Sequence, residues 1–211
     1  MLSTANYAGL PSAAALQRLA QSLAVLDAIN SPDWEYRYYS YNPHWAPGEA
    51  VLEMRDGEGD EMLVLFRSEG CVINGFLHEY EQPTKAQVTR GLPEAFDSFV
   101  FEEPVNSLGT TFCLWYTPAH GWQRGVVENE DDGSEELLYI FDNDPATYAE
   151  WATDYYLDET DRRPLTAAAV APIYHHEVLT KAMVLALNEE LEDWVALAAE
   201  LQEIGYPYDF S

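Results

Sequence analysis

The spacing of apolar residues changes twice along this chain of 211 residues, and these two changes constrain its fold more than any other feature. The first segment, residues 12–29, has leucines at intervals of three and four residues, which is typical of one face of a helix. These leucines are Leu16, Leu19, Leu23 and Leu26. Ser12 stands at the N-cap position, and Pro32 follows the last periodic residue, so we expect an amphipathic helix between them.

From residue 33 to residue 142 the pattern becomes that of short β-strands. Apolar and aromatic runs alternate with segments that contain glycine or proline. Gly70 follows Arg67-Ser68-Glu69 in a link short enough for a hairpin, where glycine can adopt a positive φ. Residues 83–109 are interpreted as a crossover with a short helix at 94–99. The seven predicted strands are 34–41, 50–54, 62–67, 71–77, 111–117, 122–127 and 137–141.

After residue 142 the pattern becomes helical again. Asp144 can cap a helix whose first residue is Pro145, and the following apolar residues fall on one face. A second helical region covers 166–187, and a third begins after Asn188 and ends at Gly205. The last residues, 206–211, form a short aromatic tail that we expect to pack on the core.

This order predicts an α+β protein with an antiparallel or mixed sheet of about seven strands, one N-terminal helix and about three C-terminal helices. We expect one domain over 1–211, divided into an N-terminal helix region (1–31), a sheet region (33–142), a helical region (144–205) and the tail (206–211). A chain of this length can bury a core without disulfides or metals. Cys71 and Cys113 both lie in apolar runs, which favours buried thiols.

The charge is strongly unbalanced, with 37 acidic residues against 10 lysines and arginines and a net charge of -27. Such a surface repels nucleic-acid phosphates and anionic lipid headgroups, which argues against both as partners. The apolar N-terminal segment 10–29 is interrupted by polar residues, and no base precedes it. We therefore expect neither a signal peptide nor a transmembrane span, and a cytoplasmic location.

Common catalytic and metal-binding motifs are absent from the sequence. It contains no G-x-S-x-G elbow, no Walker loop, no G-x-G-x-x-G and no pair of C-x-x-C knuckles. Residues 176–180 resemble a zinc-protease motif, but Thr180 stands where the second histidine would be needed. Residues 56–67 and 128–139 resemble calcium loops, but Arg67 and Tyr139 replace the carboxylate at the twelfth position. We expect no catalytic, cofactor-binding or metal-binding residues.

We therefore base the predicted function on the excess of negative charge. A negative field of this size speeds encounter with a basic partner, so we favour a protein that binds a basic protein, in the manner of an immunity protein or antitoxin. Trp45 lies in a proline-bracketed loop and is a candidate interface anchor. The candidate partner-binding residues are Glu58, Asp60, Glu61, Glu128, Glu130, Asp131, Asp132, Glu135, Glu136 and Trp45.

Two other interpretations stay open. The protein could be a hydrolase that uses carboxylates or a divalent cation, since paired acids support that chemistry. It could also be a domain without a ligand of its own, whose charge reflects an acidic proteome.

Several segments also resemble a family of stand-alone acidic bacterial proteins that have no assigned activity. The similarity extends from Asp33 to Pro207. It implies one compact bacterial domain and assigns no site residue. The segments that carry it are YNPHW, EMRDGEGDE, GF-HE, TTFCLWY, DGSEELL, DPATYAEWATDYY and IGYP.

Overall fold

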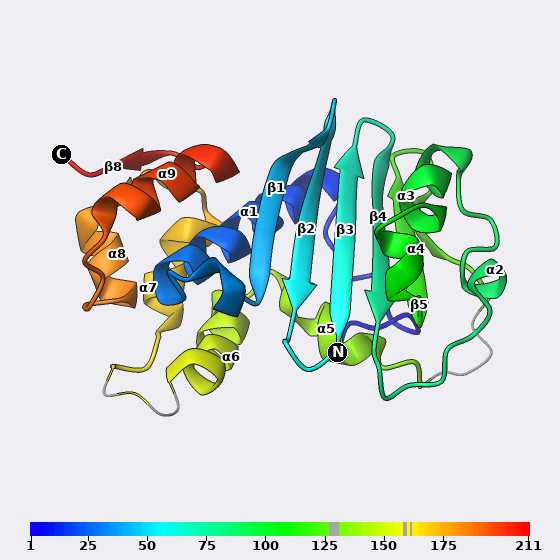
Figure 1. Ribbon diagram of the computed structural model, residues 1–211, viewed down its shortest axis with the longest axis horizontal. Helices are drawn as coiled ribbons and strands as arrows, with labels where there is room; N and C mark the ends of the chain where they lie inside the picture. Colours follow the sequence, from blue (N-terminus) through cyan, green and yellow to red (C-terminus); the bar gives the residue numbers. More distant parts are fainter. Residues whose placement is uncertain (127–130, 158–159, 161) are drawn as a thin grey trace.

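The computed structural model describes residues 1–126, 131–157, 160 and 162–211, and it has the α+β architecture that the sequence predicts. Helix α1 (Ala13–Asn30) precedes an antiparallel sheet whose six strands are ordered as they occur in the chain (Figure 1). The strands are β1 (Tyr39–Ala46), β2 (Glu49–Arg55), β3 (Glu61–Arg67), β4 (Gly70–Phe76), β5 (Phe112–Thr117) and β6 (Gly121–Arg124).

Short helices fill the crossover between β4 and β5, and longer ones follow the sheet. The crossover contains α2 (Lys85–Val88), α3 (Asp97–Phe101) and α4 (Val105–Leu108). The later helices are α5 (Ser134–Leu138), α6 (Pro145–Leu157), α7 (Ala167–Tyr174), α8 (Lys181–Leu187) and α9 (Trp194–Ile204). Single 3-10 turns occur at Trp34–Tyr36, Glu94–Phe96 and Tyr139–Asp142. Two short strands, β7 (Leu179–Thr180) and β8 (Tyr208–Asp209), pair in parallel.

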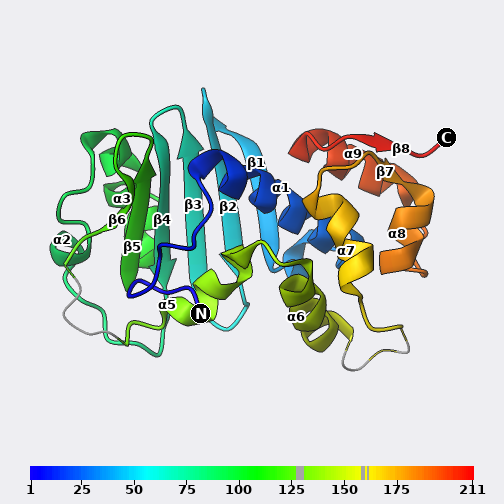
Figure 2. The same ribbon diagram turned by 180° about the vertical axis from the view of Figure 1, so that it is seen from behind.

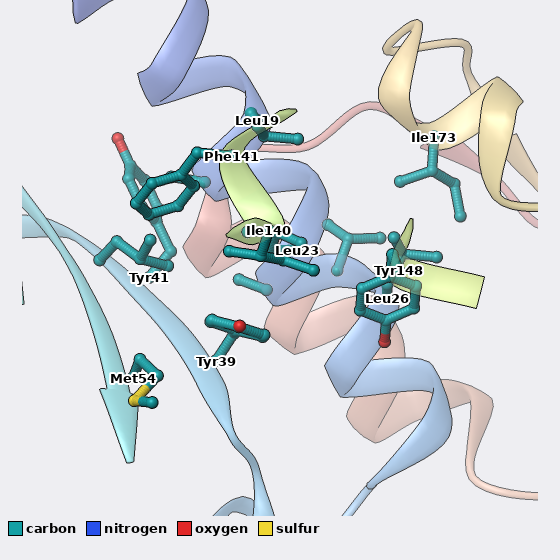
Figure 3. Packing of buried hydrophobic residues seen from close by; sticks show 14 of the residues in the cluster. Leu19, Leu23, Leu26, Tyr39, Tyr41, Met54, Ile140, Phe141, Tyr148 and Ile173 are labelled. Atoms are coloured by element: carbon teal, nitrogen blue, oxygen red, sulfur yellow. The ribbon is translucent and has the colours of Figure 1, made fainter. Parts of the chain in front are cut away.

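Side chains alternate between the two faces of the sheet along each strand, so each face carries its own set of apolar residues. Helices cover both sets. Helix α1 crosses one face, and α3 and α4 lie on the other, over β4 and β5, with α2 toward the β6 edge (Figures 1 and 2). In the first core, Leu19, Leu23 and Leu26 of α1 lie near Tyr39 and Tyr41 of β1 (Figure 3). The paired residues that face α1 are Leu52, Val64, Ile73 and Leu114, and those that face the crossover are Val51, Leu65, Val72 and Trp115.

The hairpin between β3 and β4 depends on Gly70. Its φ is +140°, and a Cβ at this position would lie 1.9 Å from the carbonyl oxygen of Tyr116 on the neighbouring strand. Only a residue without a side chain fits there. The predicted glycine of this hairpin is therefore confirmed.

The predicted strand at residues 137–141 is wrong. Leu137 and Leu138 belong to α5, and Ile140 and Phe141 belong to the 3-10 turn that follows it. All four side chains are buried, and a short run of buried residues has the same apolar signal in a strand and in a helix. The sheet consequently has six strands in the described part of the chain, not seven.

Three further boundaries differ from prediction. The aromatic run at residues 34–41 begins with a 3-10 turn, and β1 instead extends to Ala46 with a register irregularity after Asn42. The helical region 166–187 is divided by β7. Part of the tail forms β8, which pairs with β7. Among the described residues, no helix combines the length and apolar character needed to cross a membrane.

A buried carboxylate joins α1, β1 and α6. Asp27 of α1 is fully buried and accepts three hydrogen bonds: from the backbone N–H of Tyr39 at 2.6 Å, and from the hydroxyls of Tyr148 and Tyr156, both at 2.7 Å. Burial raises its pKa from 3.8 to about 6, although these three donors and nearby Arg37 oppose the rise. The ionised form is therefore less favourable in the folded protein than in the unfolded chain.

This pKa predicts how Asp27 contributes to stability. Because the folded-state pKa is raised, the contribution is fully present below pH 3.8 and is lost as the pH rises through 6. The free energy of unfolding of the wild type, minus that of Asp27→Asn, should fall by about 2 kcal/mol between pH 4 and pH 7. Urea unfolding at a series of pH values measures this difference. The two proteins share every other titratable group, so the contributions of those groups cancel in the difference. A difference that does not change with pH would contradict the prediction.

Candidate functional site

The loop between β2 and β3 is built around one carboxylate. Asp56 Oδ1 accepts hydrogen bonds from the backbone N–H groups of Glu58, Gly59 and Asp60 at 2.8–2.9 Å. Three donors on one oxygen fix a tight turn, and an aspartate side chain readily makes such bonds to its own backbone. The loop therefore holds its acids in defined positions, with Glu58 exposed to solvent.

A second acidic segment begins at Asp131 and continues into α5. Asp131, Glu135 and Glu136 are exposed. Figure 1 shows α5 at the same end of the sheet as the loop between β2 and β3, although more than 70 residues separate them in the sequence. The fold thus places the two predicted acidic segments at one end of the molecule.

Residues 77–80, after β4, connect the two segments. Asp60 Oδ1 accepts hydrogen bonds from the backbone N–H of His78 at 2.9 Å and from its Nδ1 at 2.7 Å. On the other side, the Tyr80 hydroxyl donates to Glu136 Oε1. Gly133 packs closely against the same segment, since a Cβ there would lie 2.8 Å from both Leu77 and Tyr80. One short segment therefore contacts both groups of acids.

We call this surface the acidic face. The hydrogen bond to Glu136 raises the pKa of Tyr80 to about 12, and the hydrogen bond to Asp60 raises the pKa of His78. Burial and the neighbouring Glu53 raise the pKa of Glu61. The acidic face consists of Asp56, Glu58, Asp60, Glu61, Glu79, Asp131, Glu135 and Glu136.

Asp132, a candidate partner-binding residue, points into the protein. It is 9% exposed, and its Oδ2 accepts a hydrogen bond from the Thr4 hydroxyl at 2.6 Å. Its Oδ1 accepts from the backbone N–H and the hydroxyl of Ser134. Asp132 thus anchors the N-terminal segment, and we do not include it in the acidic face. Glu128 and Glu130 lie outside the described residues.

Trp45 lies at the opposite end of the sheet. It is near the tip of the β1–β2 hairpin, whereas the β2–β3 loop is at the other end of these strands (Figure 1). Trp45 is 37% exposed, and its ring contacts that of Phe99 edge-on, with the centroids 6.4 Å apart. It also lines a cleft of about 290 Å³ between β1 and α9. The structure therefore does not bring Trp45 together with the predicted acids.

A pocket of about 430 Å³ adjoins the acidic face at Asp56, and we call it the aromatic pocket. Tyr155 connects the two, because its hydroxyl donates to the backbone carbonyl of Asp56 at 3.2 Å. Tyr36 and Tyr155 are 65% and 45% exposed. The aromatic pocket is lined by Glu35, Tyr36, Arg37, Arg55, Asp56, Gly57, Tyr155 and Tyr156.

Sequence reasoning missed this pocket and the link through residues 77–80. The predicted strand at 34–41 includes Trp34 and Tyr36, and the helix predicted after Asp144 has Tyr155 on its apolar face. Both patterns are ambiguous, because aromatic residues favour strands and also serve as interface anchors. The contacts of His78 and Tyr80 join residues 18 and 56 positions apart, and local sequence carries no signal for them.

The cysteines and the His175–His176 pair also have side chains with catalytic or metal-binding chemistry. Both cysteines are buried, and burial raises the pKa of each thiol, that of Cys113 to about 12, so neither is ionised at neutral pH. His176 Nε2 donates to the carbonyl of Arg18 at 2.7 Å, while the neighbouring His175 is exposed. Among the described residues, no three histidine, cysteine or acidic side chains are grouped to hold a metal ion.

Comparison of the chain with family models, with curated proteins and with solved structures gives no match in any of the three.

The contact between His78 and Asp60 can be tested by titration. In the wild type, the His78 pKa should exceed its ordinary value of 6.5, because Asp60 stabilises the imidazolium. Asp60→Asn should lower it. Glu79→Gln removes the same charge from a residue whose Oε1 lies 4.0 Å from His78 Nε2, and it should lower the pKa less. NMR titration of the imidazole resonances measures all three values, and equal effects of the two substitutions would contradict the assignment.

Proposed function

We propose that this protein binds a basic protein partner through the acidic face, and that it acts in the cytoplasm in the manner of an immunity protein or antitoxin. The observation that supports this most directly is the convergence of Asp56–Glu61 and Asp131–Glu136 at one end of the sheet, linked by His78 and Tyr80. Nucleic acids and anionic membranes are poor partners for such a surface.

The arrangement of the acidic face favours a preformed binding surface over a diffuse charge. Hydrogen bonds to Asp56, Asp60 and Glu136 fix their carboxylates before any partner arrives. Groups that are already ordered lose less conformational entropy on binding. Exposed aromatic rings beside the acids, Tyr36 and Tyr155, add the type of side chain that most often contributes strongly to protein interfaces.

The experiment compares two variants of equal charge. The first changes three exposed acids of the acidic face, Glu58, Glu79 and Glu135, to glutamine. The control changes three exposed acids outside it, Glu94, Glu102 and Glu203, to glutamine. Each variant loses three negative charges, so the net charge changes from -27 to -24 in both.

Affinity capture from a lysate of the source organism at low salt, followed by mass spectrometry, identifies the partner. We expect one stoichiometric basic protein, bound roughly tenfold more weakly by the acidic-face variant and with nearly wild-type affinity by the control. The salt dependence of binding should also become less steep only in the first variant. Equal binding by all three proteins with the same salt dependence would refute the proposal. Loss of binding in proportion to net charge alone would also refute it.

A further inference from the structure

The aromatic pocket is lined by two acids, Glu35 and Asp56, that have no ion-pair partner among the described residues. Two arginines contribute to its lining, but each has a carboxylate partner that is not part of the pocket. Arg37 Nη1 lies 2.8 Å from Glu200 Oε2, and Arg55 Nε lies 3.6 Å from Glu53 Oε1. In the described part of the chain, neither Glu35 nor Asp56 forms an ion pair with a base.

The Arg55 side chain is held at the wall of the pocket. Its guanidinium lies over the ring of Trp34, 4.3 Å from the ring centroid, and its Nε lies 3.6 Å from Glu53 Oε1. Arg55 is therefore engaged by Trp34 and Glu53.

The walls of the pocket are aromatic. Tyr36 and Tyr155 are both substantially exposed, and Tyr155 is held by a stack on Trp151, with the ring centroids 5.3 Å apart. The electron-rich faces of such rings attract cations, and arginine more often than lysine. A volume of about 430 Å³ lies in the range of pockets that enclose a ligand group.

We propose that the aromatic pocket binds an arginine side chain of the partner protein. Its guanidinium pairs with the carboxylates of Glu35 and Asp56 and contacts the rings of Tyr36 and Tyr155. Arginine fits better than lysine, because its planar guanidinium pairs with carboxylates through several donors and stacks on aromatic rings. This inference rests on the proposed function, since the pocket shares Asp56 with the acidic face.

The test uses a small probe and does not require the partner. N-acetyl-arginine methylamide is titrated into the ¹⁵N-labelled protein, with the citrulline and lysine analogues as matched probes. Citrulline keeps the length and planar end of arginine but has no charge. We expect millimolar binding of the arginine probe, with amide shifts centred on Tyr36, Gly57 and Tyr155. The citrulline probe should bind at least about tenfold more weakly, and the lysine probe more weakly than arginine.

Two substitutions of equal charge localise the binding. Glu35→Gln should weaken the arginine probe by roughly fivefold, because the lost carboxylate lies in the pocket. Glu58→Gln, on the acidic face but not in the lining of the pocket, should leave its affinity nearly unchanged. Absence of shifts at the pocket, equal binding of arginine and citrulline or of arginine and lysine, or equal effects of both substitutions would overturn the inference.

Failure of this inference can be distinguished from failure of the proposed function. If the pocket does not select arginine but the partner is still captured through Glu58, Glu79 and Glu135, only the inference fails. If the pocket binds the arginine probe and no basic protein is captured, the pocket exists and the proposed function fails.

Discussion

The buried hydrogen bonds of Asp27 determine how the two parts of the molecule meet. One carboxylate receives the first backbone N–H of β1 and two tyrosine hydroxyls of α6, so it fixes the sheet and the later helices relative to α1. A buried carboxylate is tolerated only where such partners surround it. The same helix α6 then carries Tyr155, whose hydroxyl holds the loop of Asp56. The shape of the surface pocket thus depends on a polar contact in the core.

Local sequence determined the elements whose signal is periodic or stereochemical. The leucine spacing of α1, the short apolar runs of β2–β5 between glycine- or proline-containing segments, and the glycines Gly70 and Gly205 at positive φ were all predictable from a few neighbouring residues. The errors fall where burial is complete or pairing is distant. Residues 137–141 are buried in a helix and a turn, and β8 is ordered by pairing with β7, about 30 residues earlier. Neither fact is encoded in a short window.

The candidate site was predictable in composition but not in arrangement. Glycine-containing acidic stretches indicated exposed loops, and the structure places Glu58 and Glu135 in solvent. The same reasoning could not identify Asp132 as a buried anchor, because its partner Thr4 lies 128 residues away in the sequence. Trp45 was grouped with the acids because prolines bracket it and tryptophan is common at interfaces. Which residues share a surface follows from strand order and from long-range contacts.

The way in which the acidic face is ordered explains how it can keep its charge. Among the described residues, no lysine or arginine forms an ion pair with Asp56, Asp60 or Glu136. Backbone N–H groups hold Asp56 and a phenol holds Glu136, whereas Asp60 is held by the backbone and the imidazole of His78, which is charged when protonated. The uncharged donors at Asp56 and Glu136 fix a carboxylate without cancelling its field, whereas a lysine partner would do both. Mutual repulsion among these acids lowers stability, and a basic partner relieves it on binding. A surface of this kind is ordered before it meets its partner and is still attractive to it.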